Sequence, residues 1–284
     1  MLSEKEMISL VRMLDDPDEV IASNIIEKLT SCGRQAIPLL ESIWELNLNP
    51  IVEQRILSLK QQILEDDAVS FFSNWRKNPE QDILDAWLHI SELFEPLSNK
   101  ENILNFINKV RFDAWMEMND NLTTFEKCNI LIRVFQQKHQ ISIITDESKR
   151  ISSNYLLSDF ANNKRASRTT IAIQFQYIAN TLGIKLIGLN FFEYAILGYL
   201  NPDATSEIGN RDNILFYIVF GEKISIIGNK QLDLGLNIDD ASLYTPASQV
   251  QILHKIIYGL QISYTKENCD WETKICKKII KILS

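Results

Sequence analysis

The sequence predicts a helix-rich α+β protein in which one central helix lies on an antiparallel sheet. Apolar residues recur at helical spacing through the N-terminal half of the chain and again near its C-terminus. Between these regions the spacing changes to short apolar segments bounded by polar residues or proline, which is typical of strands. Helical regions on both sides of a short run of strands indicate an α+β fold.

Residues 1–65 are predicted to form helical hairpins. Amphipathic helices are expected at Met7–Leu14 and Glu19–Leu29, separated by the acidic segment Asp15–Asp18, which suits a helix end and an N-cap. A third helix follows Pro38, and a fourth begins at Pro50. This order and spacing resemble HEAT-type hairpins, which stack in pairs. Two such units are few, so we expect them to pack on the following domain.

The helical pattern continues from residue 66 towards the central helix. Trp75, Trp87 and Trp115 lie in apolar stripes, and we expect burial in helix contacts for all three rather than a binding surface. Thr123 or Thr124 is expected to cap the next helix.

The central helix and the sheet follow. Apolar residues from Ile171 to Leu182 recur at mostly helical spacing, which predicts a largely buried helix that ends at Gly183 in a left-handed C-cap. We expect four strands after it, at Lys185–Asn190, Tyr194–Leu200, Leu215–Val219 and Lys223–Ile227.

The C-terminal region, residues 245–284, is predicted to be a helical hairpin. Thr245 or Ser248 is expected to cap its first helix, and a turn at Glu267–Asp270 separates the two helices. This hairpin resembles a single tetratricopeptide-like unit. The predicted organisation is therefore HEAT-like hairpins at 1–65, a core with a helical lead-in at 66–244, and the hairpin at 245–284.

The order of the central segments also resembles a known family. The pieces LGI, GLNFFEYAILGY and ILFYIVFG after the central helix are similar in order and hydrophobic pattern to the transglutaminase-like proteins of the bacterial SirB branch. The resemblance covers most of the chain, and it implies a papain/transglutaminase-like core.

The polar positions of that family are replaced here. The family's histidine falls on Tyr194, next to Glu193, and its aspartate or asparagine falls on Val219. The start of the helix, where a working transglutaminase carries cysteine, reads Ala166 to Thr170. A tyrosine with an ordinary pKa near ~10 is a poor base at neutral pH, and a valine accepts no hydrogen bond.

The resemblance therefore implies a pseudoenzyme with no catalytic residues and a relict cleft. Candidate residues of this cleft are Thr169, Thr170, Glu193, Tyr194 and Val219. We expect a protein- or peptide-binding module that uses the relict cleft or the flanking hairpins. The alternative is a hydrolase or acyltransferase with a rebuilt site, in which a threonine nucleophile would need an adjacent base. A third possibility is a purely structural or oligomerising domain.

Composition excludes some classes of partner. The net charge is −8 with dispersed lysines and arginines, which argues against nucleic acid or an anionic membrane as the main partner. The four cysteines have no CxxC spacing. His89 has no second His or Cys at ligand spacing, and we expect it to be a packed or capping histidine; His139 and His254 are expected to be structural or surface groups. We therefore expect no cofactor and no metal. With no signal peptide and no long apolar run, the expected location is the cytoplasm.

Overall fold

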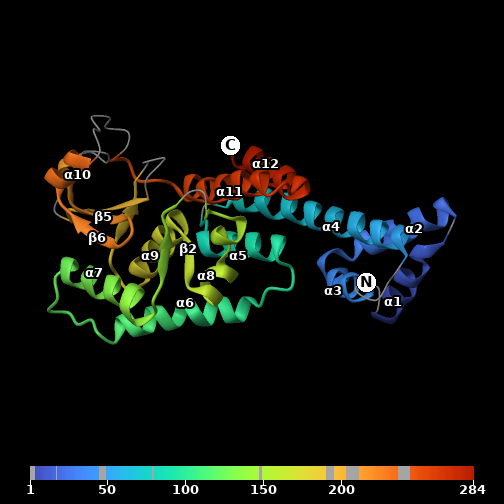
Figure 1. The fold of residues 1–284 in the computed structure, drawn as a ribbon, viewed down its shortest axis with the longest axis horizontal. Coiled ribbons are helices and arrows are strands. Elements are labelled where there is room, and N and C mark those ends of the chain that lie inside the picture. The colour runs from blue at the N-terminus through green and yellow to red at the C-terminus, as the bar shows by residue number, and fades with distance from the viewer. Residues whose placement is uncertain are drawn as a thin grey trace.

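Helices form most of the molecule in the computed structural model of this chain, which is a helix-rich α+β protein. The structure describes residues 4–16, 18–44, 49–78, 80–146, 149–189, 195–202, 211–235 and 244–284. Figure 1 shows an elongated molecule with the N-terminal helices at one end and the larger sheet at the other.

The N-terminal helices follow the prediction. Local signals set their limits, because the side chains of Asp18 and Asn49 cap two of them by accepting hydrogen bonds from Val20 N and Ile51 N. The helices are α1 (Glu4–Arg12), α2 (Glu19–Ser31), α3 (Ile37–Trp44) and α4 (Pro50–Lys77), with short 3₁₀ turns η1 (Met13–Asp15) and η2 (Gly33–Ala36).

α4 connects the two ends of the chain. Its 28 residues extend about 42 Å at 1.5 Å per residue, from the N-terminal helices to the C-terminal hairpin (Figure 1). Near its middle, Glu65 Oε1 accepts a hydrogen bond of 2.8 Å from Lys278 Nζ, and near its end Arg76 donates to the Leu283 carbonyl. The predicted limit between residues 65 and 66 falls inside this continuous helix, and the division into domains stays a prediction.

Three further helices lead to the core. They are α5 (Ile83–Phe94), α6 (Lys100–Trp115) and α7 (Thr124–Arg133), and α7 continues into one π-helical turn, η3 (Val134–Lys138). Thr123 caps α7 in a capping box with Glu126, as predicted. Trp75 and Trp87 are buried, but the expectation for Trp115 was wrong. Its side chain is 59% exposed, because the buried stripe of α6 runs through Val110 and Ala114 and Trp115 lies beside that stripe on another face of the helix.

The core contains a four-stranded antiparallel sheet in the order β3-β4-β5-β6. Its strands are β3 (Leu186–Gly188), β4 (Ile196–Leu200), β5 (Ile214–Phe220) and β6 (Ile224–Ile227). All four overlap the predicted strands, of which Asn190 and Tyr194 lie outside the described residues. The central helix α9 (Arg168–Thr181) packs on one face of the sheet. α9 ends with Gly183 at φ +79°, which is the predicted left-handed C-cap.

The segment before α9 is more structured than the sequence pattern indicates. A 3₁₀ turn, η5 (Ser152–Tyr155), and the short helix α8 (Leu157–Asn163) precede α9. Strand β2 (Arg165–Ser167) leads directly into α9 and pairs in parallel with β1 (Ser142–Ile144). These elements hold the start of the central helix.

The C-terminal hairpin covers the back of the core. Helices α11 (Gln249–Lys266) and α12 (Asp270–Leu283) pack on each other, and α12 lies along α4. Ser248, one of the two predicted caps, caps α11. α10 (Asn229–Gly235) follows β6 at the far end of the sheet. One cluster of buried apolar side chains runs from Met7 to Leu283 and joins the N-terminal helices, core and hairpin.

No helix within the described residues is both long enough and apolar enough to cross a membrane. Over the same ranges, no group of three or more His, Cys, Asp or Glu side chains is placed to hold a metal ion.

Candidate functional site

Thr170, at the start of α9, is fully buried and holds the backbone in place. Its Oγ1 donates a hydrogen bond of 2.9 Å to the Asn154 carbonyl and lies 2.9 Å from Ser167 Oγ. Ser167 caps α9 by accepting a hydrogen bond from Thr170 N. The Thr170 hydroxyl thus joins η5 to α9, and none of its described partners is a base that could activate it.

Thr169 lies on the partly exposed side of the same turn. It lines a narrow cleft of about 40 Å³ between α9, β3, β4 and α11, together with Gln176 and Lys255. Lys255 Nζ donates to the Leu189 carbonyl at 3.2 Å, and burial lowers the pKa of this amine. A space of this size holds a water molecule or two, so the described walls leave no room for a peptide.

Val219 of β5 lies opposite Ile196 of β4, which lines the same small cleft as Thr169. Side chains alternate along β5, so Ile218 and Phe220 face the main core while Val219 packs against a smaller cluster that includes Tyr217. Phe220 packs edge-on against Phe175 of α9, with ring centroids 5.6 Å apart. Val219 is therefore a neighbour of this cleft, although it is not one of its described lining residues. Glu193 and Tyr194 lie outside the described residues.

The four cysteines are free, and none lies at the start of α9. Cys128 and Cys276 are buried, and burial raises the pKa of the Cys128 thiol to about 12. A thiol of this kind is protonated at neutral pH and is a poor nucleophile.

A larger cavity lies between the N-terminal helices and the core. Its volume is about 330 Å³, which is within the range of small-ligand sites. α3 provides one side, the connection between α5 and α6 a second, and α8 a third. Its lining residues are Glu41, Glu95, Pro96, Leu97, Ser98, Asn99, Asn102, Ile103, Ser158 and Asn162.

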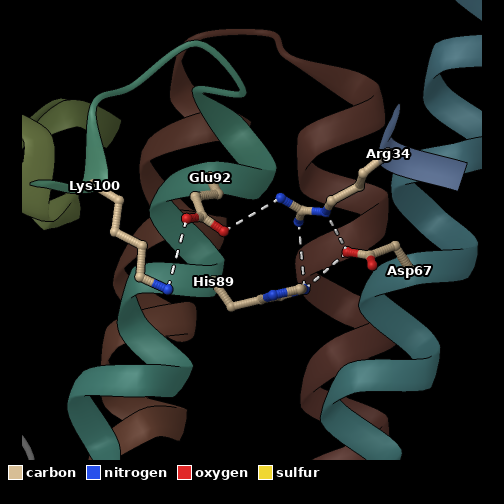
Figure 2. Close-up of polar contacts among 5 residues, drawn as sticks. All are labelled: Arg34, Asp67, His89, Glu92 and Lys100. Carbon is tan, nitrogen blue, oxygen red and sulfur yellow. Dashed lines mark hydrogen bonds and ion pairs between the residues drawn. The ribbon is translucent and has the colours of Figure 1, made fainter. Parts of the chain in front are cut away.

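A polar network joins η2, α4, α5 and the start of α6 (Figure 2). Arg34 of η2 contacts Asp67 of α4 at 2.6 Å and Glu92 of α5 at 3.5 Å, and Lys100 at the start of α6 lies 3.9 Å from Glu92. His89 Nε2 lies 2.9 Å from Asp67 Oδ2 and 3.4 Å from Arg34 Nη2. Figure 2 shows Arg34 reaching across from the N-terminal unit to both helices.

His89 is packed, as the sequence predicts. Its ring stacks on Phe71 with centroids 3.8 Å apart and planes within 5°. The network and this stack hold the N-terminal helices against α5, and so fix the distance between α3 and the α5–α6 connection across the cavity.

We expect Asp67→Asn to lower the free energy of unfolding by about 1–2 kcal/mol at neutral pH. Burial acts to raise the pKa of Asp67, but the hydrogen bonds and charges of His89 and Arg34 outweigh it and leave this pKa below its ordinary value of 3.8. The folded-state pKa is depressed, so the stabilisation is complete above about pH 4 and is lost as the pH falls through the folded-state pKa.

Urea unfolding at about pH 7 and about pH 3 measures both parts of this expectation. Asp66→Asn is the matched control, because Asp66 is the exposed neighbour of Asp67 on α4. An equal loss in the two variants, or a difference between Asp67→Asn and wild type that grows at low pH, contradicts the assignment.

Sequence reasoning missed the residues around the cavity. The local signal was limited to the connection Glu95–Asn99, whose proline, serine and asparagine predict a turn and an N-cap before α6. No pattern in the neighbouring sequence predicts that Glu41 or Ser158 lies near this turn. Their positions depend on how α3 and α8 pack against the rest of the protein. Comparison of the chain with models of known families, with curated proteins and with solved structures found no match in any of the three.

Proposed function

We propose that this chain is a catalytically inactive, transglutaminase-like protein of the SirB type that binds a peptide segment of a protein partner. The observation that carries the proposal is the use of the Thr170 hydroxyl as a structural hydrogen-bond donor to the Asn154 carbonyl. A nucleophile needs a base within hydrogen-bond reach, whereas this hydroxyl is fully buried among backbone and capping groups.

The 330 Å³ cavity between α3, the α5–α6 connection and α8 is the binding site that we propose. It is more than eight times larger than the 40 Å³ cleft beside Thr169. Its walls offer carboxylates, hydroxyls and amides beside the apolar side chains of Pro96, Leu97 and Ile103. Such a mixed lining suits a side chain of a bound peptide. Its apolar residues would bury the surface of that side chain, and its polar groups would fix the orientation.

The alternative, a hydrolase or acyltransferase with a rebuilt site, is favoured by one observation. Lys255, whose pKa is lowered by burial, lines the same small cleft as Thr169. An amine of this kind is able to act as a base for a threonine hydroxyl. The narrow cleft and the hydrogen bond from Lys255 to a backbone carbonyl argue for a structural role instead.

A display selection of random peptides on the intact protein tests the proposal. Asn162→Trp places a large ring at the exposed rim of the cavity, and Asn163→Trp, the next residue of α8, is exposed and outside the lining. Selected peptides are expected to bind wild type and Asn163→Trp equally, and Asn162→Trp at least about tenfold more weakly. No enrichment over bare resin, or equal binding to both variants, overturns the proposal.

The same preparation is assayed for hydrolysis of a fluorogenic glutamine amide and of a phenyl ester. The proposal expects no turnover that depends on Thr169 or Lys255. Turnover that disappears in both Thr169→Ala and Lys255→Met would establish the alternative.

A further inference from the structure

The ionisable side chains that line the cavity between α3 and the α5–α6 connection are all acidic. Of its ten lining residues, Glu41 and Glu95 are ionisable, and none is a lysine, arginine or histidine. Lys60, outside the lining, pairs with Glu41, and among the described residues Glu95 has no ion pair. The lining therefore keeps about one uncompensated negative charge.

The position of Glu95 strengthens this field. Glu95 is the C-cap residue of α5, a helix of 12 residues, so its carboxylate lies at the end where the helix carbonyls concentrate partial negative charge. A carboxylate there is unfavourable by itself, whereas a cation is favoured by both the carboxylate and the helix end. The Ser158 hydroxyl, 5% exposed, donates to Glu95 Oε2 and directs this carboxylate between α5 and α8.

Ser98 supplies an independent observation. Its Oγ is shielded from solvent and has no hydrogen-bond partner among the described residues, although Ser98 belongs to the cavity lining. Shielded polar groups in folded proteins are normally paired, so a bound donor or acceptor would satisfy this hydroxyl. The side-chain oxygens of Asn102 and Asn162 add further acceptors to the same lining.

We propose that this cavity binds the guanidinium group of an arginine side chain presented by the peptide partner, an inference that rests on the proposed function. A guanidinium has several N–H donors and no acceptor, which matches a lining rich in oxygen acceptors. It is also more weakly hydrated than the ammonium of lysine and is buried more readily. Its aliphatic stem would lie against Pro96, Leu97 and Ile103.

The test uses short glycine peptides with blocked ends and a central arginine, lysine or citrulline. Citrulline has nearly the shape of arginine but no charge. Titration into isotope-labelled full-length protein, followed by amide NMR shifts, is expected to move the resonances of residues 95–99 and Ser158 with the arginine peptide, less with lysine, and not with citrulline.

Glu95→Gln keeps the acceptor for Ser158 but removes the charge, and it is expected to weaken binding of the arginine peptide by about tenfold. Glu41→Gln is expected to weaken it as well. Glu222→Gln removes the same charge from the exposed turn between β5 and β6, which is not part of the cavity lining, and should leave binding unchanged. Thermal unfolding of each variant verifies its fold.

Equal shifts with arginine and citrulline, shifts outside the cavity, or no shifts at all overturn the inference. The proposed function is decided separately by the peptide selection. In one outcome, selected peptides bind wild type more tightly than Asn162→Trp and yet tolerate replacement of every arginine. That result would support the proposed peptide binding and contradict the arginine site.

Discussion

Replacement of Trp87 by alanine is expected to lower the free energy of unfolding by about 3–5 kcal/mol. Trp87 on α5 is fully buried and is one of the largest side chains of the core. Its Nε1 donates a hydrogen bond of 2.8 Å to the Tyr155 carbonyl in η5. Alanine leaves a cavity and also leaves that carbonyl without its partner, and both effects act in the same direction.

Urea unfolding followed by far-UV circular dichroism gives the measurement, with Trp115→Ala as control. Trp115 is 59% exposed, so its truncation should cost less than about 1 kcal/mol. Trp87→Phe keeps an aromatic ring but removes the N–H group. A loss of unfolding free energy between those of wild type and Trp87→Ala would separate the contribution of packing from that of the hydrogen bond. Similar losses for Trp87→Ala and Trp115→Ala contradict this account of the core.

Local chemistry made the helices and strands predictable. Thr123 with Glu126 forms a capping box, and Gly183 adopts the positive φ that ends the central helix, because both signals depend on neighbouring residues only. The strands of the large sheet were recognisable from the same kind of local pattern. In contrast, β1 and β2 have three residues each, which is too short for any period to be visible.

The candidate site was harder to predict from local sequence patterns. Alternation along β5 already implies that Val219 and Phe220 face opposite sides, and the structure places Phe220 towards α9. The cavity depends on long-range packing instead, since Glu41, Glu95 and Ser158 come from separate helices or their ends. The exposure of Trp115 also depends on packing, because neighbouring elements cover only the face of α6 that carries Val110 and Ala114.

A large loss of stability is also expected for Gly259→Ala, because the added methyl group would meet the ring of Tyr155. Gly259 is buried in α11, and a Cβ atom there would lie 2.2 Å from Tyr155 Cε1 and 2.6 Å from Cζ. Alanine normally stabilises a helix by about 1 kcal/mol relative to glycine. Here we expect a net loss of about 2 kcal/mol, because the ring of Tyr155 is 6% exposed and overpacking forces it or α11 to shift.

The double variant Gly259→Ala with Tyr155→Leu isolates this contact. Tyr155→Leu alone destabilises by creating a cavity, and the added methyl group then fills part of it, so the two losses should sum to more than the loss in the double variant. Gly228→Ala is the control, since a Cβ at Gly228 meets nothing within 4 Å and its effect should stay within about 0.5 kcal/mol. Additive losses, or a gain in stability from Gly259→Ala alone, would mean that α11 does not pack on η5 as closely as described. The hairpin would then no longer help to hold Asn154, and with it the Thr170 hydroxyl, in the arrangement from which we propose that the site is inactive.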